Sequence, residues 1–162
     1  MAIKADCSGW ATKAILCSDG RTILQNAFSE CDGKTVPVVW NHEHNDPNAV
    51  LGRALLENRG DGVYAYITFN DTDAGQNAKK LVQHKDVDRL SIYANKLIQR
   101  GGDVIHGIIR EVSLVLAGAN PGAVIDTVIA HGEDSEIEGY IMSGEYIENI
   151  DTLSHSDDSE DK

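Results

Sequence analysis

Three polar side chains interrupt apolar stretches of the sequence, and together they have the chemistry of nucleophilic catalysis. His42 directly follows the apolar run 36–40, Ser91 lies within a second apolar stretch, and Glu111 lies in the middle of a third. A serine hydroxyl is a poor nucleophile until a base removes its proton, and a neutral imidazole is suited to that task. A carboxylate can orient the imidazole and stabilise its charged form. The three residues therefore supply one candidate for each role.

Each candidate also has a simpler explanation. His42 could belong to a solvated loop, and Ser91 could bond a neighbouring backbone carbonyl or face solvent from an edge strand. Glu111 could be a surface carboxylate that pairs with Arg110 or Arg89. An unpaired charge is rarely buried, so a carboxylate within a long apolar stretch is the hardest of the three to dismiss. Sequence spacing by itself does not bring the three side chains together.

A metal-dependent hydrolase is an alternative enzyme class. His42, His44 and Asp46 alternate along an extended segment, and His84 or His106 could add a ligand. Imidazole and carboxylate groups suit zinc or manganese. The sequence contains no H-E-x-x-H pattern, so we expect neither a metal nor another cofactor.

The elements that must position these residues are mostly strands. Alternating apolar and polar residues over 63–69 indicate a β-strand. The residues at 71–73 can cap a helix, and Ala78, Leu81 and Val82 would form its inner face. The expected strands are 10–17, 36–40, 51–57, 63–69, 89–98 and 104–116; the expected helix is 74–84, and 123–130 is an element of uncertain type.

The strands 89–98 and 104–116 are predicted to form a hairpin that carries two of the candidates. If the hairpin turns about Gly101, Ser91 lies directly opposite Glu111. Directly opposite residues have Cβ atoms about 5 Å apart. A strict two-residue turn at Gly101 and Gly102 would instead place Val112 opposite Ser91.

The charge divides the chain into two parts. Residues 132–162 contain eleven of the 26 acidic residues and a single basic one, so residues 1–131 are nearly neutral although the whole chain has a net charge of −12. We expect one folded domain over 1–131. Residues 132–162 are expected to be an acidic, flexible tail or a linker toward a scaffold segment, because their apolar residues are too sparse for a core.

Composition excludes several classes of protein. Apolar residues make up 41% of the chain, yet no run approaches the roughly 20 residues of a membrane helix. Basic residues are scattered and aromatic residues amount to 6%, so no nucleic-acid surface is expected. Cys7, Cys17 and Cys31 are odd in number and lack C-x-x-C spacing, which indicates free thiols in a reducing compartment.

At the three candidates the sequence resembles the caudovirus prohead proteases, the HK97-like capsid maturation proteases. The order and spacing of the motifs agree with that family over roughly residues 8–126, although no single motif is specific. The matching segments are Gly9-Trp10-Ala11, Asn26-Ala27-Phe28, Val38-Val39-Trp40-Asn41-His42, Leu90-Ser91-Ile92, Glu111-Val112-Ser113-Leu114-Val115 and Ala119-Asn120-Pro121.

The resemblance implies a mostly β (α+β) fold, a small closed or partly open β-barrel with flanking helices, as in the herpesvirus assemblins. Those enzymes use Ser, His and a second His, and the second His corresponds to Glu111. The resemblance thus implies a serine endopeptidase with Ser91 as nucleophile, His42 as base and Glu111 as third member.

The resemblance also implies substrates, partners and location. The enzyme would cleave scaffold protein or the scaffolding segment of the major capsid protein, and also itself. It would act inside the immature prohead in the host cytoplasm, and it would self-associate into a homo-oligomer.

The sequence departs from its relatives in two places. Many relatives have Gly where this chain has Tyr93, and no Arg follows Glu111 over residues 112–126 to organise an oxyanion site. Backbone N–H groups of Gly118, Ala119 and Asn120 are the candidate oxyanion donors, because a tetrahedral intermediate needs preorganised donors. These departures leave open a catalytically inactive, protease-like scaffold or capsid-binding module.

Overall fold

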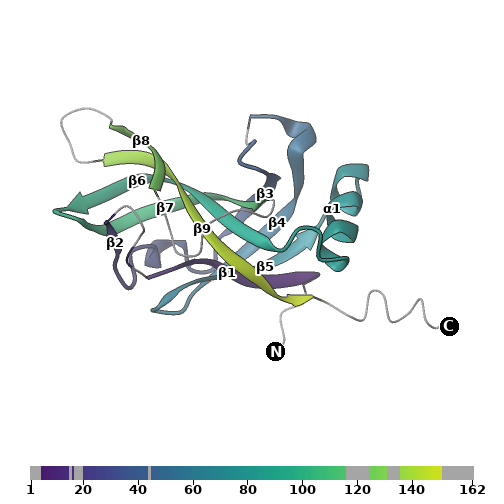
Figure 1. The fold of residues 1–162 in the computed structure, drawn as a ribbon, viewed down its shortest axis with the longest axis horizontal. Helices are drawn as coiled ribbons and strands as arrows, with labels where there is room; N and C mark the ends of the chain where they lie inside the picture. Colours follow the sequence, from purple (N-terminus) through teal and green to yellow (C-terminus); the bar gives the residue numbers. More distant parts are fainter. Residues whose placement is uncertain are drawn as a thin grey trace.

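The computed structural model describes residues 5–14, 16, 20–43, 45–115, 125–130 and 136–150 (Figure 1). None of the helices in these residues is both long and apolar enough to cross a membrane. In chain order the elements are β1 (Cys7–Lys13), β2 (Thr22–Ile23), η1 (Ser29–Cys31), β3 (Thr35–Trp40), η2 (Pro47–Ala49), β4 (Val50–Asn58), β5 (Gly62–Phe69), α1 (Asp73–Gln83), β6 (Arg89–Arg100), β7 (Asp103–Val115), β8 (Ile125–Ala130) and β9 (Glu136–Ile150).

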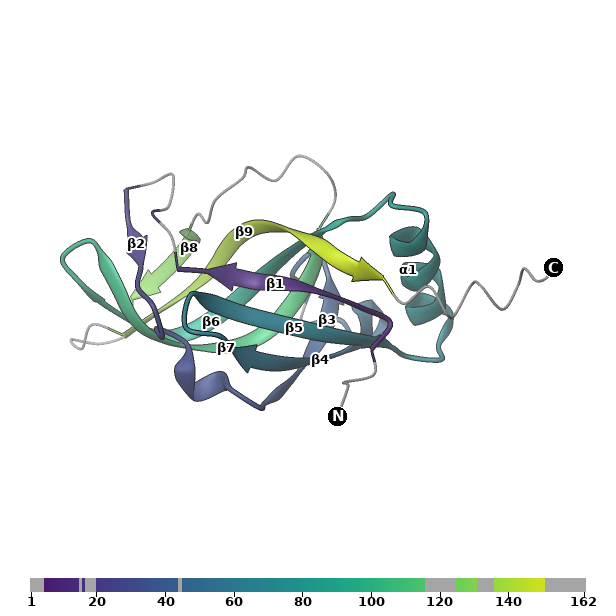
Figure 2. The same cartoon turned by 90° about the horizontal axis from the view of Figure 1, so that it is seen from below.

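Most of these strands form one curled sheet that returns to its first strand. Hydrogen-bonded neighbours follow the order β1-β5-β4-β3-β7-β6-β9, and the end of β9 pairs with β1 (Figures 1 and 2). Within this ring the pairing of β3 with β7 is parallel and the described neighbours otherwise run antiparallel. The mostly β class with a barrel-like sheet and a flanking helix, expected from the resemblance, is confirmed.

The hydrophobic core fills the inside of the sheet, as the alternation of side chains along a strand requires. The apolar residues predicted on one face of β5 are indeed buried. They are Val63, Ala65, Ile67 and Phe69. Leu90 and Ile92 of β6 join the same core, as do Val112 and Leu114 of β7. The residues between them on these two strands therefore project from the other face of the sheet.

Strand β9 lies where the sequence predicts a flexible tail. Glu136–Ile150 pairs with β6 and then with β1. A strand that adds to existing edges takes its hydrogen bonds from its neighbours' backbone and needs no separate core of its own. Residues 136–150 thus form a strand within the segment expected to be a tail or linker. The division of the chain at 131/132 stays a prediction, and 151–162 lie outside the described residues.

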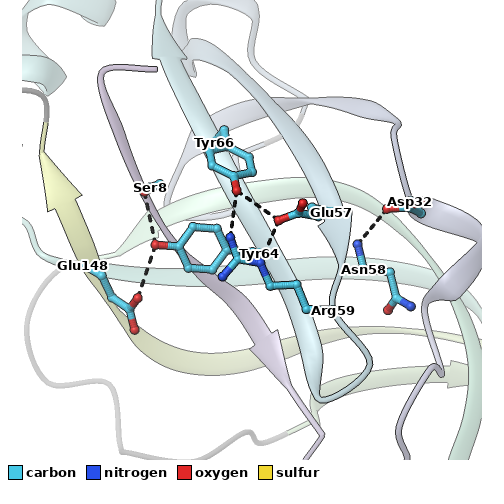
Figure 3. Close-up of polar contacts among 8 residues, drawn as sticks. All are labelled: Ser8, Asp32, Glu57, Asn58, Arg59, Tyr64, Tyr66 and Glu148. Carbon is cyan, nitrogen blue, oxygen red and sulfur yellow. Dashed lines mark hydrogen bonds and ion pairs between the residues drawn. The ribbon is translucent and has the colours of Figure 1, made fainter. Parts of the chain in front are cut away.

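Side-chain contacts also join β9 to the sheet. The hydroxyl of Tyr64 in β5 donates to Glu148 Oε1 at 3.2 Å and lies 3.2 Å from Ser8 Oγ of β1 (Figure 3). Beside this group, Arg59 donates to Glu57 Oε1 at 2.7 Å and lies over the Tyr64 ring, 3.8 Å from its centroid (Figure 3). The contacts of Tyr64 with Ser8 and Glu148 reinforce the β1–β9 pairing on the outer face of the sheet.

Helix α1 lies at one end of the sheet, against β4 and β5 (Figures 1 and 2). Thr72 caps its N-terminus, because the Thr72 side chain accepts the Gly75 N–H at 3.0 Å. Ala78 and Val82 of the predicted inner face are buried, and Leu81 packs against the core. The sequence-based helix is thus confirmed to within one residue at each end.

Replacing Gly75 with alanine is expected to destabilise the protein by about 2 kcal/mol, as overpacking does. A Cβ at this position would collide with the backbone carbonyl of Asn70 and come within 2.8 Å of the Leu51 carbonyl oxygen. Urea unfolding measures the loss. Gly102→Ala is the matched control, because the nearest atom to its added Cβ, Gly20 O, is 3.8 Å away. Equal stabilities of the two variants would contradict this account of the helix packing.

Candidate active site

The β6–β7 hairpin places Ser91 and Glu111 on the same face of the sheet. Ser91 pairs with Ser113, and Tyr93 pairs with Glu111. Because side chains alternate between faces along a strand, all four of these residues project away from the core. The candidate nucleophile and the candidate carboxylate are therefore diagonal neighbours in the ladder.

The register differs from both sequence-based alternatives. The turn itself is the two-residue one, since Arg100 pairs with Asp103 across Gly101 and Gly102. Irregularities along the hairpin, the last of them between Tyr93 and Ala94, then shift the pairing before it reaches the site. Ser91 thus lies opposite neither Glu111 nor Val112. A one-residue slip exchanges the two faces of a strand, and the bulged register keeps both candidates on the outer face.

Strand β3 brings His42 to this face. β3 runs parallel to β7, with Val39 opposite Ser113, and the Asn41 N–H continues the pairing to Leu114 O at 2.9 Å. The chain then turns: Asn41 and His42 have φ values of 50° and 62°. This left-handed conformation is uncommon for residues other than glycine and favours Asn and His among them. The turn ends the strand directly beside the β6–β7 hairpin.

The imidazole of His42 lies between the serine and the carboxylate. His42 Nε2 is 3.0 Å from Ser91 Oγ, and His42 Nδ1 is 2.9 Å from Glu111 Oε1. Ser91 is 0% exposed and Glu111 1%, whereas the His42 side chain is 11% exposed. The structure therefore brings His42 into contact with Ser91 and Glu111, which lie 49 and 69 positions away from it along the chain.

The order of contacts has a direct chemical meaning. With its proton on Nδ1, the ring donates to the Glu111 carboxylate and leaves the Nε2 lone pair to accept the Ser91 hydroxyl proton. Which nitrogen carries the proton follows from these partners. The three side chains can therefore act as a hydroxyl nucleophile, a general base and a carboxylate that orients the base.

Ser113 belongs to the same cluster, although the sequence analysis did not single it out. Its Oγ accepts the His42 backbone N–H at 2.8 Å, donates to Glu111 Oε1 at 2.9 Å and lies 3.1 Å from His42 Nδ1. A signal was available: Ser113 is a polar residue in an apolar strand, two positions from Glu111, and so shares its face.

The candidate oxyanion donors fall in a part of the chain that the structure does not describe. Gly118, Ala119 and Asn120 lie outside the described residues. Their assignment stays a prediction that rests on the need of a tetrahedral intermediate for fixed donors.

The residues of the metal alternative have other positions. His44 lies outside the described residues, and Asp46 caps η2 by accepting the Asn48 N–H at 2.9 Å. His106 Nδ1 is 3.5 Å from Glu30 Oε2. Among the described residues, no group of three or more His, Cys, Asp or Glu could hold a metal ion.

Two of the three cysteines are buried free thiols, as predicted, and Cys17 lies outside the described residues. Burial, with a smaller effect of the Asp6 carboxylate, raises the pKa of Cys7 to about 12. Burial likewise raises the pKa of Cys31. Since the thiolate is the reactive form, burial makes both thiols poor nucleophiles.

The loop that carries His42 also borders a pocket of about 300 Å³. Leu51, Ala78 and Leu81 contribute apolar walls from β4 and α1, and Glu43 and Asp46 contribute acidic groups from the loop. The pocket is therefore bordered by α1, by β4 and by the loop that follows His42.

Comparison with known protein families matches residues 10–137 to the family described as caudovirus prohead serine protease. That range includes His42, Ser91 and Glu111. Neither a curated protein nor a solved structure matches the chain significantly.

Proposed function

Because the chain belongs to the caudovirus prohead serine protease family, we propose that it cleaves peptide bonds with Ser91 as nucleophile, His42 as general base and Glu111 as the orienting acid. One observation carries the assignment of residues. It is the continuous contact from Ser91 Oγ through the His42 ring to Glu111 Oε1, at 3.0 and 2.9 Å. Serine, histidine and carboxylate in this order form the arrangement that activates a hydroxyl.

The proposed reaction has two halves. In the first, Nε2 of His42 takes the Ser91 proton while Oγ attacks the carbonyl carbon of the scissile bond. The same nitrogen then gives that proton to the departing amine, which leaves an ester on Ser91. In the second half, water loses a proton to Nε2 and attacks the ester carbon; the bond to Ser91 Oγ breaks, the carboxylic acid product leaves, and Nε2 returns the proton to Oγ. Throughout, Glu111 holds Nδ1–H and stabilises the imidazolium when it forms.

Access to the nucleophile is part of the proposal. Ser91 has no exposed surface, while the His42 side chain retains a small exposed fraction. A substrate must therefore open this region before its carbonyl carbon reaches Oγ, and catalytic contacts often tighten only in the complex. Backbone donors at Gly118, Ala119 and Asn120 would then stabilise the oxyanion.

The pocket beside the His42 loop would receive one substrate side chain. Its apolar walls suit an aliphatic chain, and the acidic groups of Glu43 and Asp46 favour a cationic end. The proposed substrates are scaffold protein, or the scaffolding segment of the major capsid protein, and the chain itself. The proposed place of action is the interior of the immature prohead in the host cytoplasm, where self-association into a homo-oligomer accompanies high local concentration.

A serine-directed phosphonate reagent tests the assignment. We expect one phosphonyl group on the intact protein, located at Ser91 by peptide mass spectrometry, because Oγ is activated by His42. The His42→Ala variant should be labelled at least about 100-fold more slowly, since general-base assistance contributes about 10²–10⁴-fold. Ser8→Ala, which changes a buried serine of β1 far along the chain, should be labelled at the wild-type rate.

A chain that cleaves its substrate but is labelled on another serine would contradict the assignment of Ser91. A folded chain that neither cleaves nor reacts would favour the inactive, capsid-binding module.

A further inference from the structure

Ser113 makes three contacts within the proposed active site and has no assigned role. It is fully buried on the outer face of β7, directly opposite Ser91. Its hydroxyl contacts the His42 backbone N–H, the His42 ring and the Glu111 carboxylate at 2.8, 3.1 and 2.9 Å. A single side chain thus joins the strand that carries the acid to the turn that carries the base.

The hydrogen-bonding capacity of the Ser113 hydroxyl determines which of its contacts are hydrogen bonds. A serine hydroxyl has one proton to donate and two lone pairs. Its proton goes to Glu111 Oε1, and one lone pair accepts the His42 backbone N–H. The His42 Nδ1–H then has Glu111 Oε1 at 2.9 Å as its nearer partner, and a charge-assisted bond to a carboxylate is the stronger choice. Ser113 therefore holds the acid without taking its place beside the ring.

The backbone contact bears on the conformation of His42. Asn41 and His42 are consecutive left-handed residues, with φ values of 50° and 62°. Non-glycine residues hold such a conformation only when the surrounding structure determines it. The Ser113 hydroxyl binds the N–H of His42, while the Asn41 N–H is bound by the Leu114 carbonyl. Neighbouring residues of β7 thus fix both peptide groups of the turn.

We propose that Ser113 is a positioning residue, which sets the His42 ring and the Glu111 carboxylate at the distances that general-base catalysis by His42 requires. This inference rests on the proposed function, because it assumes that Ser91, His42 and Glu111 perform the reaction. Ser113 itself touches no reacting atom. Its loss shifts the ring and the carboxylate, and small misplacements in an active site reduce turnover strongly.

The sharpest test compares Ser113→Thr with Ser113→Val. Both side chains are β-branched, so both add the same bulk to a fully buried strand position and suit a strand equally. They differ in the hydroxyl. We expect kcat to be about 10- to 100-fold higher for the threonine variant than for the valine variant, with KM within about twofold. Cleavage of a peptide substrate by each purified full-length variant supplies both constants. The rate at which the phosphonate labels Ser91 should fall in parallel with kcat in the valine variant.

A stability control separates positioning from folding. Ser8 is also a buried strand serine, and its hydroxyl contacts Tyr64 on another part of the sheet. Ser8→Ala should leave kcat unchanged, and Ser113→Ala should lower it, when both variants are assayed at a temperature at which circular dichroism shows them folded.

Equal kcat values for the threonine and valine variants would overturn the role of Ser113. That result leaves the proposed function standing if Ser91→Ala is inactive. Full activity of Ser91→Ala would instead remove the proposed function itself.

Discussion

Replacing Ser91 with alanine is expected to lower proteolysis by at least about 10⁴-fold, since residues of a nucleophile–base pair act as a unit and their loss removes most of the rate. The change deletes the oxygen that lies 3.0 Å from His42 Nε2. Alanine places no polar atom at this fully buried position, so the sheet should remain folded. Co-expression with the scaffold and major capsid proteins, followed by intact-mass analysis, measures processing of substrate and of the chain itself.

The matched control for this experiment is Ser8→Ala. It removes a hydroxyl from another buried strand serine, 6% exposed, that contacts Tyr64 and not the His42 ring. Processing should continue at the wild-type rate in this variant. Undiminished processing by a folded Ser91→Ala protein would eliminate Ser91 as the nucleophile.

Replacing Glu111 with glutamine is expected to reduce kcat by about 10³–10⁴-fold, the scale found when a triad carboxylate becomes an amide. The amide has nearly the same shape but lacks the charge that stabilises the imidazolium. When the NH2 group of the amide occupies the position of Glu111 Oε1, the His42 ring nitrogen and the Ser113 hydroxyl face a donor in place of an acceptor. The favoured tautomer of His42 can therefore change. Steady-state kinetics on a peptide substrate measures the loss.

The Glu111→Gln variant should keep most of its stability although it loses activity. Glu111 is 1% exposed, and burying a carboxylate costs free energy that its partners must offset. The free energy of unfolding of Glu111→Gln should therefore stay within about 2 kcal/mol of the wild type. Glu57→Gln is the control: this exposed carboxylate, whose pKa is lowered by its hydrogen bonds to Arg59 and Tyr66, lies away from the site. Wild-type kcat in Glu111→Gln would contradict its role.

Local chemistry made several elements predictable. The alternation in β5 and the spacing of apolar residues in α1 report which side faces the core, and Thr72 is a standard capping residue. The two glycines at 101 and 102 mark the hairpin turn. Each of these features depends on neighbours in sequence, and each is found where it was predicted.

Other features depend on partners that are distant in sequence. Bulges between Tyr93 and the turn shift the ladder, and nothing in the local composition marks them. The sequence predicts a flexible tail or linker over residues 136–150, yet they form β9 because the edges of β6 and β1 supply backbone partners. Ser113 became part of the cluster only when β3 placed His42 beside it.

The sequence by itself determined the residue types, the family and the main strands and helix between residues 35 and 115, because side-chain chemistry and short-range periodicity are written along the chain. The tertiary structure decided the distances. The bulged β6–β7 pairing, the parallel β3–β7 pairing and one left-handed turn set the His42 ring 3.0 Å from Ser91 and 2.9 Å from Glu111. Backbone pairing between remote strands controls register, and register decides which polar side chains meet on one face.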